Sequence, residues 1–300
     1  MLLIILCLFQ VVSSCRILAL SGGGAHGAFQ AGVIKNLHDN GVKWDIITGV
    51  SAGALNAMAL SIYNSSDQSS GVSLMENVWM NITSSDVYRW NWNPLFDQSL
   101  LDSSPLNGTL YGITNTFGGV AQRDVIIGSV VLNSGIMELF GRGDLNSTIR
   151  TTTIVMASSA IPLIFPPVYL DDDYYVDGGT ASNELIVPGI KYCIARGLHD
   201  VTIDVIICSP PIDNITNPSI EKMGIFGLAT RAYDIMSNAV FNHELYTSCK
   251  ANEMTFPIYI YKPTSPYPGN MMNFDHEYIV TMFKMGLNVT QPKVAKYCFA

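Results

Sequence analysis

A serine between two glycines, in the segment GVSAG at residues 49–53, restricts the fold of this chain more than any other feature. The apolar residues 45–50 predict a buried strand, and the small apolar residues 52–62 predict a helix packed closely on a sheet. Flanking glycines let the backbone bend sharply between the two, which projects the Ser51 oxygen above the edge of the sheet. This arrangement predicts a nucleophile elbow; the plainer interpretation is a tight structural turn.

A similar strand–turn–helix unit comes earlier in the chain. Residues 16–20 predict a strand that ends in the glycine-rich turn 22–27. The helix after it has apolar residues on one face and a stop signal at Asn40 and Gly41. Together the two units predict parallel strands joined by a right-handed crossover.

Further elements follow the same reasoning. Residues 64–123 are polar, aromatic and loop-rich, with few strand signals. Neither an internal repeat nor a Pro/Gly/Ser linker divides the chain, which favours one α/β domain over two. Strands are expected at 125–131, 151–156, 201–208 and 256–261, and helices at 225–244 and 275–285.

The composition limits the possible partners. The chain is 48% hydrophobic and only 13% charged, which suits a buried parallel sheet and also work at a lipid surface. A net charge of −8 argues against nucleic acid as a partner. Because no basic run is present, membrane contact would rest on apolar and aromatic groups.

The N-terminus predicts export. Residues 1–12 are almost wholly apolar but too short to span a bilayer, so we expect a signal peptide at 1–15, although no Lys or Arg precedes the apolar run. A buried first strand is the alternative, and residues 12–15 also resemble a bacterial lipoprotein box. Secretion, or the lumen of the secretory pathway, is the expected location. Six glycosylation sequons agree with it: Asn64, Asn81, Asn107, Asn146, Asn214 and Asn288.

Cleavage after Cys15 would leave four cysteines: Cys193, Cys208, Cys249 and Cys298. Four cysteines allow three pairings, and sequence does not choose among them. Four buried free thiols are the alternative.

Gly22, Gly23 and Gly24 are the candidate oxyanion hole, because backbone N–H groups at the end of a strand can point at a developing negative charge. With Gly27 they also fit a dinucleotide-binding fingerprint. That interpretation fails because Ser51 stands where an acidic residue should contact the ribose. No Walker-type Gly-Lys-Ser/Thr is present either.

Asp177 is the candidate base. It follows the strand-like residues 174–176 and precedes Gly178 and Gly179, so a tight turn would direct its carboxylate into a site. An ordinary Asp-Gly turn is the alternative.

Taken together, these motifs resemble the patatin-like phospholipase family. The family's marks are a glycine-rich loop, a serine elbow and a later Asp-Gly-Gly, which stand here at 22–27, 49–53 and 177–179 in the family's order. One departure is His26, where many members have Arg or Lys. The resemblance covers roughly residues 16–290, with the motifs at about 16–190, and also includes the segments 157–166 and 273–286 and residue Asn183.

This resemblance implies a three-layer α/β/α domain over residues 16–300 with a mainly parallel central sheet. It also implies a Ser51–Asp177 dyad that cleaves acyl esters of phospholipids or other glycerolipids. Ser51 would attack the carbonyl, Asp177 would accept the proton, and N–H groups of Gly23 and Gly24 would hold the oxyanion. No cofactor or metal is implied, and the motif glycines are Gly27, Gly49, Gly53, Gly178 and Gly179.

Three alternatives stay open. A Ser-His-Asp triad would use His199, His243 or His276, all of which follow Asp177. A non-catalytic lipid-binding or storage protein would keep the fold without turnover. An acyltransferase would pass the acyl group to an alcohol instead of water.

An aromatic cluster at 78–96 predicts either a lid or interfacial patch over the acyl groove, or ordinary packing of an insertion. Its members are Trp79, Tyr88, Trp90, Trp92, Leu95 and Phe96.

Overall fold

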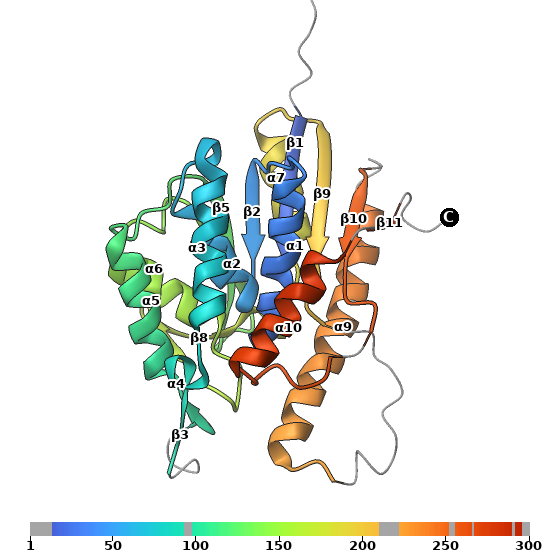
Figure 1. Ribbon diagram of the computed structural model, residues 1–300. Coiled ribbons are helices and arrows are strands. Elements are labelled where there is room, and N and C mark those ends of the chain that lie inside the picture. Colours follow the sequence, from blue (N-terminus) through green and yellow to red (C-terminus); the bar gives the residue numbers. More distant parts are fainter. Residues whose placement is uncertain are drawn as a thin grey trace, which may run out of the picture.

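The computed structural model describes residues 14–92, 98–209, 222–251, 256–265, 267–289 and 292–295. Helices cover both faces of a central sheet, in three layers (Figure 1). The predicted single α/β domain with a mainly parallel sheet is therefore confirmed. In the described part of the chain, no helix is both long and apolar enough to cross a membrane.

Five strands form the parallel centre of the sheet, in the order β10-β9-β1-β2-β5. Antiparallel strands β6, β7, β8 and β11 complete its two sides. The bounds are β1 Ser14–Leu20, β2 Ile46–Gly49, β5 Asp124–Val131, β6 Met137–Gly141, β7 Val168–Leu170, β8 Asp173–Asp177, β9 Asp200–Ile206, β10 Ile258–Tyr261 and β11 Lys293–Ala295.

Side chains of β1 alternate between two hydrophobic cores, as a central strand with both faces covered requires. Cys15, Ile17 and Ala19 belong to the core beneath α7 (Ile186–Ala195). Leu18 and Leu20 belong to the larger core on the opposite face. The side chains of this one strand of seven residues thus pack into the cores on both faces of the sheet.

The larger core is covered by a group of helices: α1 Gly27–Asp39, α2 Ala52–Ser61, α3 Gln68–Asn81, α5 Ser104–Thr116, α6 Thr148–Ser158 and α10 His276–Leu287. The long helix α9 (Ile225–Ala251) packs on α7. Short elements are η1 Gly24–His26, η2 Ser65–Asp67, α4 Ser84–Val87, η3 Gly178–Thr180 and the two-stranded sheet β3 Arg89–Trp90 and β4 Leu101–Asp102.

The strand expected at 151–156 is wrong, because these residues lie inside α6. Its β-branched run favours a strand. However, the Ser147 side chain caps the helix by accepting a hydrogen bond from the N–H of Arg150. Burial of Ile154, Val155 and Ala157 in the core then outweighs the local preference.

The expectation that 64–123 is loop-rich is also wrong in part, because α3 and α5 lie there. Their buried residues recur at helical spacing, as in Val72, Met75 and Trp79 of α3. This periodicity was present in the sequence but was obscured by the polar residues between.

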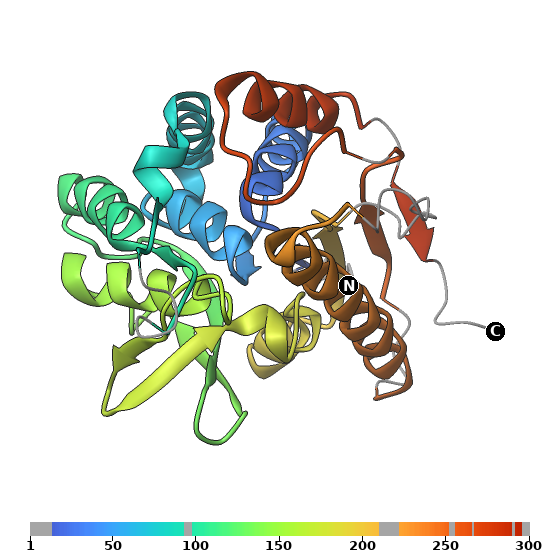
Figure 2. The same ribbon diagram turned by 90° about the horizontal axis from the view of Figure 1, so that it is seen from below.

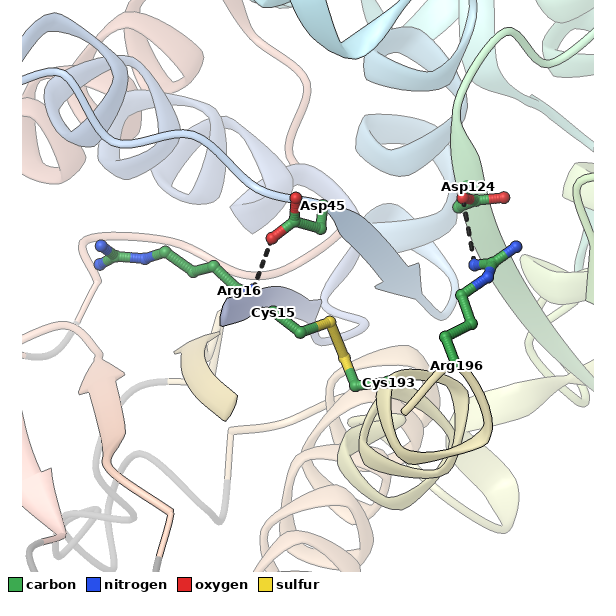
Figure 3. Close-up of a disulfide and its surroundings, with 6 residues drawn as sticks. All are labelled: Cys15, Arg16, Asp45, Asp124, Cys193 and Arg196. Atoms are coloured by element: carbon green, nitrogen blue, oxygen red, sulfur yellow. Dashed lines mark hydrogen bonds and ion pairs between the residues drawn. A yellow bond between two sulfur atoms is a disulfide. The ribbon is translucent and has the colours of Figure 1, made fainter. Parts of the chain in front are cut away.

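The amino end of β1 is cross-linked to α7 by a disulfide between Cys15 and Cys193 (Figure 3). The strand begins at Ser14, two residues earlier than expected, so Cys15 belongs to the sheet. The pairings weighed from sequence involved only the four later cysteines and missed this one. Cys208 is a buried free thiol. The described part of the structure does not include leader residues 1–13, Cys298 or the side chain of Cys249.

Candidate active site

Ser51 lies between β2 and α2 in a conformation that non-glycine residues rarely adopt, with φ 55° and ψ −123°. Its N–H donates to Ser158 Oγ at 3.0 Å, and the Ser158 hydroxyl donates to the Gly128 carbonyl at 2.7 Å. Ser158 therefore links the elbow to β5. A buried strained serine held in this way is typical of a nucleophile elbow.

The elbow requires glycine at Gly53, where α2 crosses close to β1. A Cβ atom there would lie 2.3 Å from the Leu20 carbonyl oxygen. No side chain fits at that distance, so the first turn of α2 depends on this residue. Gly49 ends β2, and Gly27 begins α1.

The glycine-rich loop passes directly over Ser51, since a Cβ on Gly22 would lie 2.9 Å from Ser51 Cβ. The Gly22 N–H donates to Asn183 Oδ1 at 3.1 Å and is not available to a substrate. The N–H groups of Gly23 and Gly24 have no hydrogen-bond partner in the described residues. The candidate oxyanion donors are thereby narrowed from three to two.

Asp177 ends β8 beside this loop and is fully buried. Its Oδ1 accepts from the Gly179 N–H at 2.8 Å and from the Tyr233 hydroxyl at 3.1 Å. Its Oδ2 is also buried and has no hydrogen-bond partner within the described ranges. The carboxylate is thus held by one oxygen, while the other remains able to take a proton. Gly178 and Gly179 belong to η3.

Burial raises the pKa of Asp177 to about 6, because a low-dielectric surrounding disfavours the charged carboxylate. Hydrogen bonding by Ser51, Gly179 and Tyr233 opposes part of this rise. The Ser51 hydroxyl is therefore close to the carboxyl group, but no hydrogen bond to Oδ2 forms among the described residues. Such loose contacts are common between a nucleophile and its base when no substrate is bound.

A pocket opens at Ser51 and runs between α2, α3 and α5. Its wall is almost wholly apolar, with Leu55, Met75 and Leu110 among its members. The polar Asn56 in the wall accepts from Trp79 Nε1 and donates to Gln30 and to the Gly27 carbonyl. An apolar chain therefore meets no unsatisfied amide there.

None of the histidines proposed for a triad lines the pocket at Ser51. His199, His243 and His276 are all exposed, whereas Ser51 and Asp177 are buried. His26 is buried in η1, with its Nε2 2.9 Å from the Tyr278 hydroxyl. Burial lowers the pKa of His26 to about 3, so its imidazole is neutral.

Tyr233 is the site residue that sequence reasoning missed. Its helix was expected, but nothing in the sequence relates a tyrosine on α9 to a carboxylate 56 residues earlier. Only the tertiary packing of α9 on η3 brings them together.

Within the described residues, no group of three His, Cys, Asp or Glu side chains is placed to hold a metal ion.

A family model described as "Patatin-like phospholipase" matches residues 18–188. The "cGAMP-activated phospholipase" of Escherichia coli (strain TW11681) is 28% identical over 196 residues, which are 56% of this chain and 52% of that protein. The protein of the same name from Vibrio cholerae is 28% identical over 241 residues, 71% of this chain and 64% of its own.

"Neuropathy target esterase sws" of Drosophila melanogaster is 28% identical over 192 residues, 63% of this chain but only 13% of that protein. This chain thus spans between about half and two thirds of the two phospholipases, and much less of the esterase. The family model covers more than half of the 300 residues and includes the glycine-rich loop, the elbow and Asp177. The chain belongs to the patatin-like phospholipase family.

Proposed function

We propose that this protein is a serine lipid acyl hydrolase that cleaves fatty-acyl esters of phospholipids or other glycerolipids. One observation carries the proposal: the strained Ser51 lies at the mouth of an apolar pocket, facing the buried Asp177. The pocket would bind the acyl chain and leave the ester carbonyl beside Ser51. Family membership supports a hydrolase of lipid esters in general.

Acylation begins when the Ser51 oxygen attacks the ester carbonyl and its proton passes to Asp177 Oδ2. Gly23 and Gly24 N–H groups stabilise the tetrahedral oxyanion, and one such donor is worth roughly 100- to 1000-fold in rate. Collapse of the intermediate breaks the bond to the alcohol, which takes the proton from Asp177. The acyl group is then esterified to Ser51.

Deacylation repeats these steps with water. Asp177 accepts a proton from the attacking water, and the same N–H groups stabilise the second intermediate. The fatty acid leaves as Ser51 recovers its proton. Ser51 and Asp177 handle the proton in both halves of the reaction. Because Asp177 must be ionised at the start, activity should rise with pH through the Asp177 pKa of about 6.

The test measures fatty-acid release by the full-length purified chain from phospholipid vesicles and triacylglycerol emulsions. Ser51→Ala and Asp177→Asn should abolish release, and Ser51→Ala should also abolish fluorophosphonate labelling. Asp173→Asn is the matched control, because it changes a carboxylate of the same strand away from the pocket.

Each other result has a clear meaning. A wild type that neither releases fatty acid nor takes the label would favour the lipid-binding protein. An active Asp177→Asn variant would favour a histidine triad. Acyl transfer to added glycerol or lysolipid, faster than hydrolysis, would identify a transferase.

We also propose that the protein docks on a lipid surface through Trp90, Trp92 and Leu163, whose exposed fractions are 61%, 101% and 71%. Leu163 stands between Ile161 and Phe165, which line the pocket, and its carbonyl accepts from the N–H of Leu100, next to the β4 residue that pairs with Trp90. Tryptophan favours the lipid–water interface. The proposal takes up the Trp90 and Trp92 part of the expected interfacial patch; Leu95 and Phe96 lie outside the described residues.

Vesicle sedimentation tests the docking surface. Leu163→Ala and the pair Trp90→Ala/Trp92→Ala should weaken binding to phosphatidylcholine vesicles while hydrolysis of a short soluble ester is kept. Ile149→Ala is the control: Ile149 is also 71% exposed, but it begins α6, which follows β6 at the opposite end of the sheet. Equal binding by all variants would contradict the proposal.

We further propose a secretory location. The Cys15–Cys193 disulfide is suited to an oxidising compartment, and the five sequon asparagines that are described are exposed. Because Cys15 is paired, we place leader cleavage before it. N-terminal sequencing and enzymatic deglycosylation of the exported protein test this; a chain kept inside the cell with free Cys15 would contradict it.

A further inference from the structure

Helix α9 reaches the active site from outside the segment matched by the family model, which ends at residue 188. Figure 2 looks onto the carboxyl ends of the parallel strands and shows the first half of α9 beside the start of α2. Tyr233 lies in this half of the helix and is only 8% exposed. Its hydroxyl is 3.1 Å from Asp177 Oδ1.

The space for this hydroxyl is made by two glycines of the motifs. A Cβ on Gly179 would lie 2.2 Å from the Tyr233 oxygen, and a Cβ on Gly22 would lie 3.3 Å from it. The phenol oxygen therefore lies between the turn that follows the base and the loop that covers Ser51. A side chain at Gly179 would push the tyrosine away from the carboxylate.

The hydrogen bond has a direct effect on the carboxylate. Oδ1 receives two donors, Gly179 N–H and the Tyr233 hydroxyl, whereas Oδ2 receives none in the described part of the chain. Two donors on Oδ1 restrain rotation of the carboxyl group and leave Oδ2 as the oxygen able to take a proton. They also favour the ionised form, so they lower the pKa of Asp177 against the effect of burial.

We propose that Tyr233 is a positioning residue of the dyad, which holds Asp177 through Oδ1 so that Oδ2 accepts the proton of Ser51. This inference rests on the proposed hydrolase mechanism. Nothing in the three sequence motifs requires a tyrosine, so the positioning group belongs to the C-terminal part of this chain.

The test compares wild type with Tyr233→Phe, which removes the hydroxyl and keeps the ring. We measure kcat and KM across pH 4.5–9 with a soluble short-chain ester, so that lipid docking plays no part. We expect kcat to fall about tenfold with KM little changed, the effect of one lost hydrogen bond. The acid limb of the kcat profile should move to higher pH, so the loss is greater at pH 6 than at pH 8.

Tyr261→Phe is the matched control. The Tyr261 hydroxyl also faces a buried aspartate, Asp204 Oδ1 at 3.5 Å, but this pair is part of the Arg16 network and not of the site. The control should keep the wild-type profile. If Tyr233→Phe does not fold, 3-fluorotyrosine at position 233 replaces it; a stronger donor should move the acid limb to lower pH.

An unchanged kcat profile for Tyr233→Phe overturns the inference. So does a lower kcat with an unmoved acid limb, because loss of packing alone gives that result. If Ser51→Ala remains active, the hydrolase mechanism itself fails. If Ser51→Ala and Asp177→Asn are inactive while Tyr233→Phe matches wild type, only the role of Tyr233 fails.

Discussion

At the amino end of the parallel strands the chain is cross-linked. At their carboxyl end, the backbone of Ser51 is strained, and Asp177 Oδ2 has no hydrogen-bond partner among the described residues. The amino end has the Cys15–Cys193 disulfide, the Arg196–Asp124 ion pair and the bond from the Arg16 N–H to Asp45 (Figure 3). The carboxyl end has Ser51 at φ 55° and the buried Asp177 with a raised pKa. The difference suggests that stability is built at one end and activity at the other.

The largest expected effect comes from Asp177→Asn, a single substitution that should lower activity and raise stability. Fatty-acid release should fall by about 10³-fold or more, because Asn does not accept the serine proton. At pH 8 the variant should nevertheless be more stable than wild type by about 1–3 kcal/mol, since the buried charge is gone. Activity assays and denaturant unfolding measure the two.

The pH dependence of this stability difference follows from the pKa of Asp177, which is about 6 when folded and 3.8 ordinarily. Above pH 6 the folded wild type carries the buried charge in full. As pH falls from 6 to 3.8 the folded state takes up a proton first, and below 3.8 both states are protonated. The gain in the free energy of unfolding should therefore vanish near pH 4. A gain that persists there would contradict burial of the charge as its cause.

The next effect concerns the pocket beside Ser51. Ala59→Phe adds a ring to the buried wall formed by α2 and should block long acyl chains. Release from long-chain esters should fall roughly 10- to 100-fold, while a short-chain ester should be cleaved at nearly the wild-type rate. The ratio of the two kcat/KM values is the measurement. Equal losses on both substrates would place the acyl chain elsewhere.

At the cross-linked end, the double variant Cys15→Ser/Cys193→Ser should lose about 2–5 kcal/mol of unfolding free energy. Its kcat at 25 °C should match wild type, since the disulfide is at the opposite end of β1 from the glycine loop. Wild type treated with reductant gives the same comparison without mutation. A change in kcat with unchanged stability would break the contrast between the two ends.

The smallest effect belongs to Arg196→Ala at the same end. Its ion pair with Asp124 is 3.2 Å long, and both side chains are partly exposed. We expect a loss of less than about 1 kcal/mol, which high salt should mask. A larger loss would mean that the Arg196 stack on the Tyr192 ring also contributes.

The parts of the fold that sequence predicted are those with strong local signals. The strand before Ser51 and the small-residue helix after it were predicted because apolar periodicity and glycines occur together there. The strand expected at 151–156 was wrong because its β-branched residues were judged without the cap at Ser147 or the core that buries them. Local propensity does not include the stabilisation that comes from burial in the core.

The site divides in the same way. Ser51, Asp177 and the glycines stand in motifs that can be recognised from their neighbours. Two other features of the site depend on segments far apart in the chain. One is the hydrogen bond from the Gly22 N–H to Asn183, which removes this N–H from the candidate oxyanion donors, and the other is the hydrogen bond from Tyr233 to Asp177. The disulfide was missed for a related reason: residues 1–15 were treated as a leader, so Cys15 was removed from the count.

The position of β1 also has a consequence for how the protein is made. Its partner on one side is β2, which follows soon after, but its partner on the other is β9, and Cys193 comes 178 residues after Cys15. At ordinary rates of translation the interval is roughly 10–40 s. Throughout it the nascent chain carries a bare apolar edge and an unpaired thiol. Yield of the active protein should therefore depend on chaperones and disulfide isomerases that protect this edge until β9 has been synthesised.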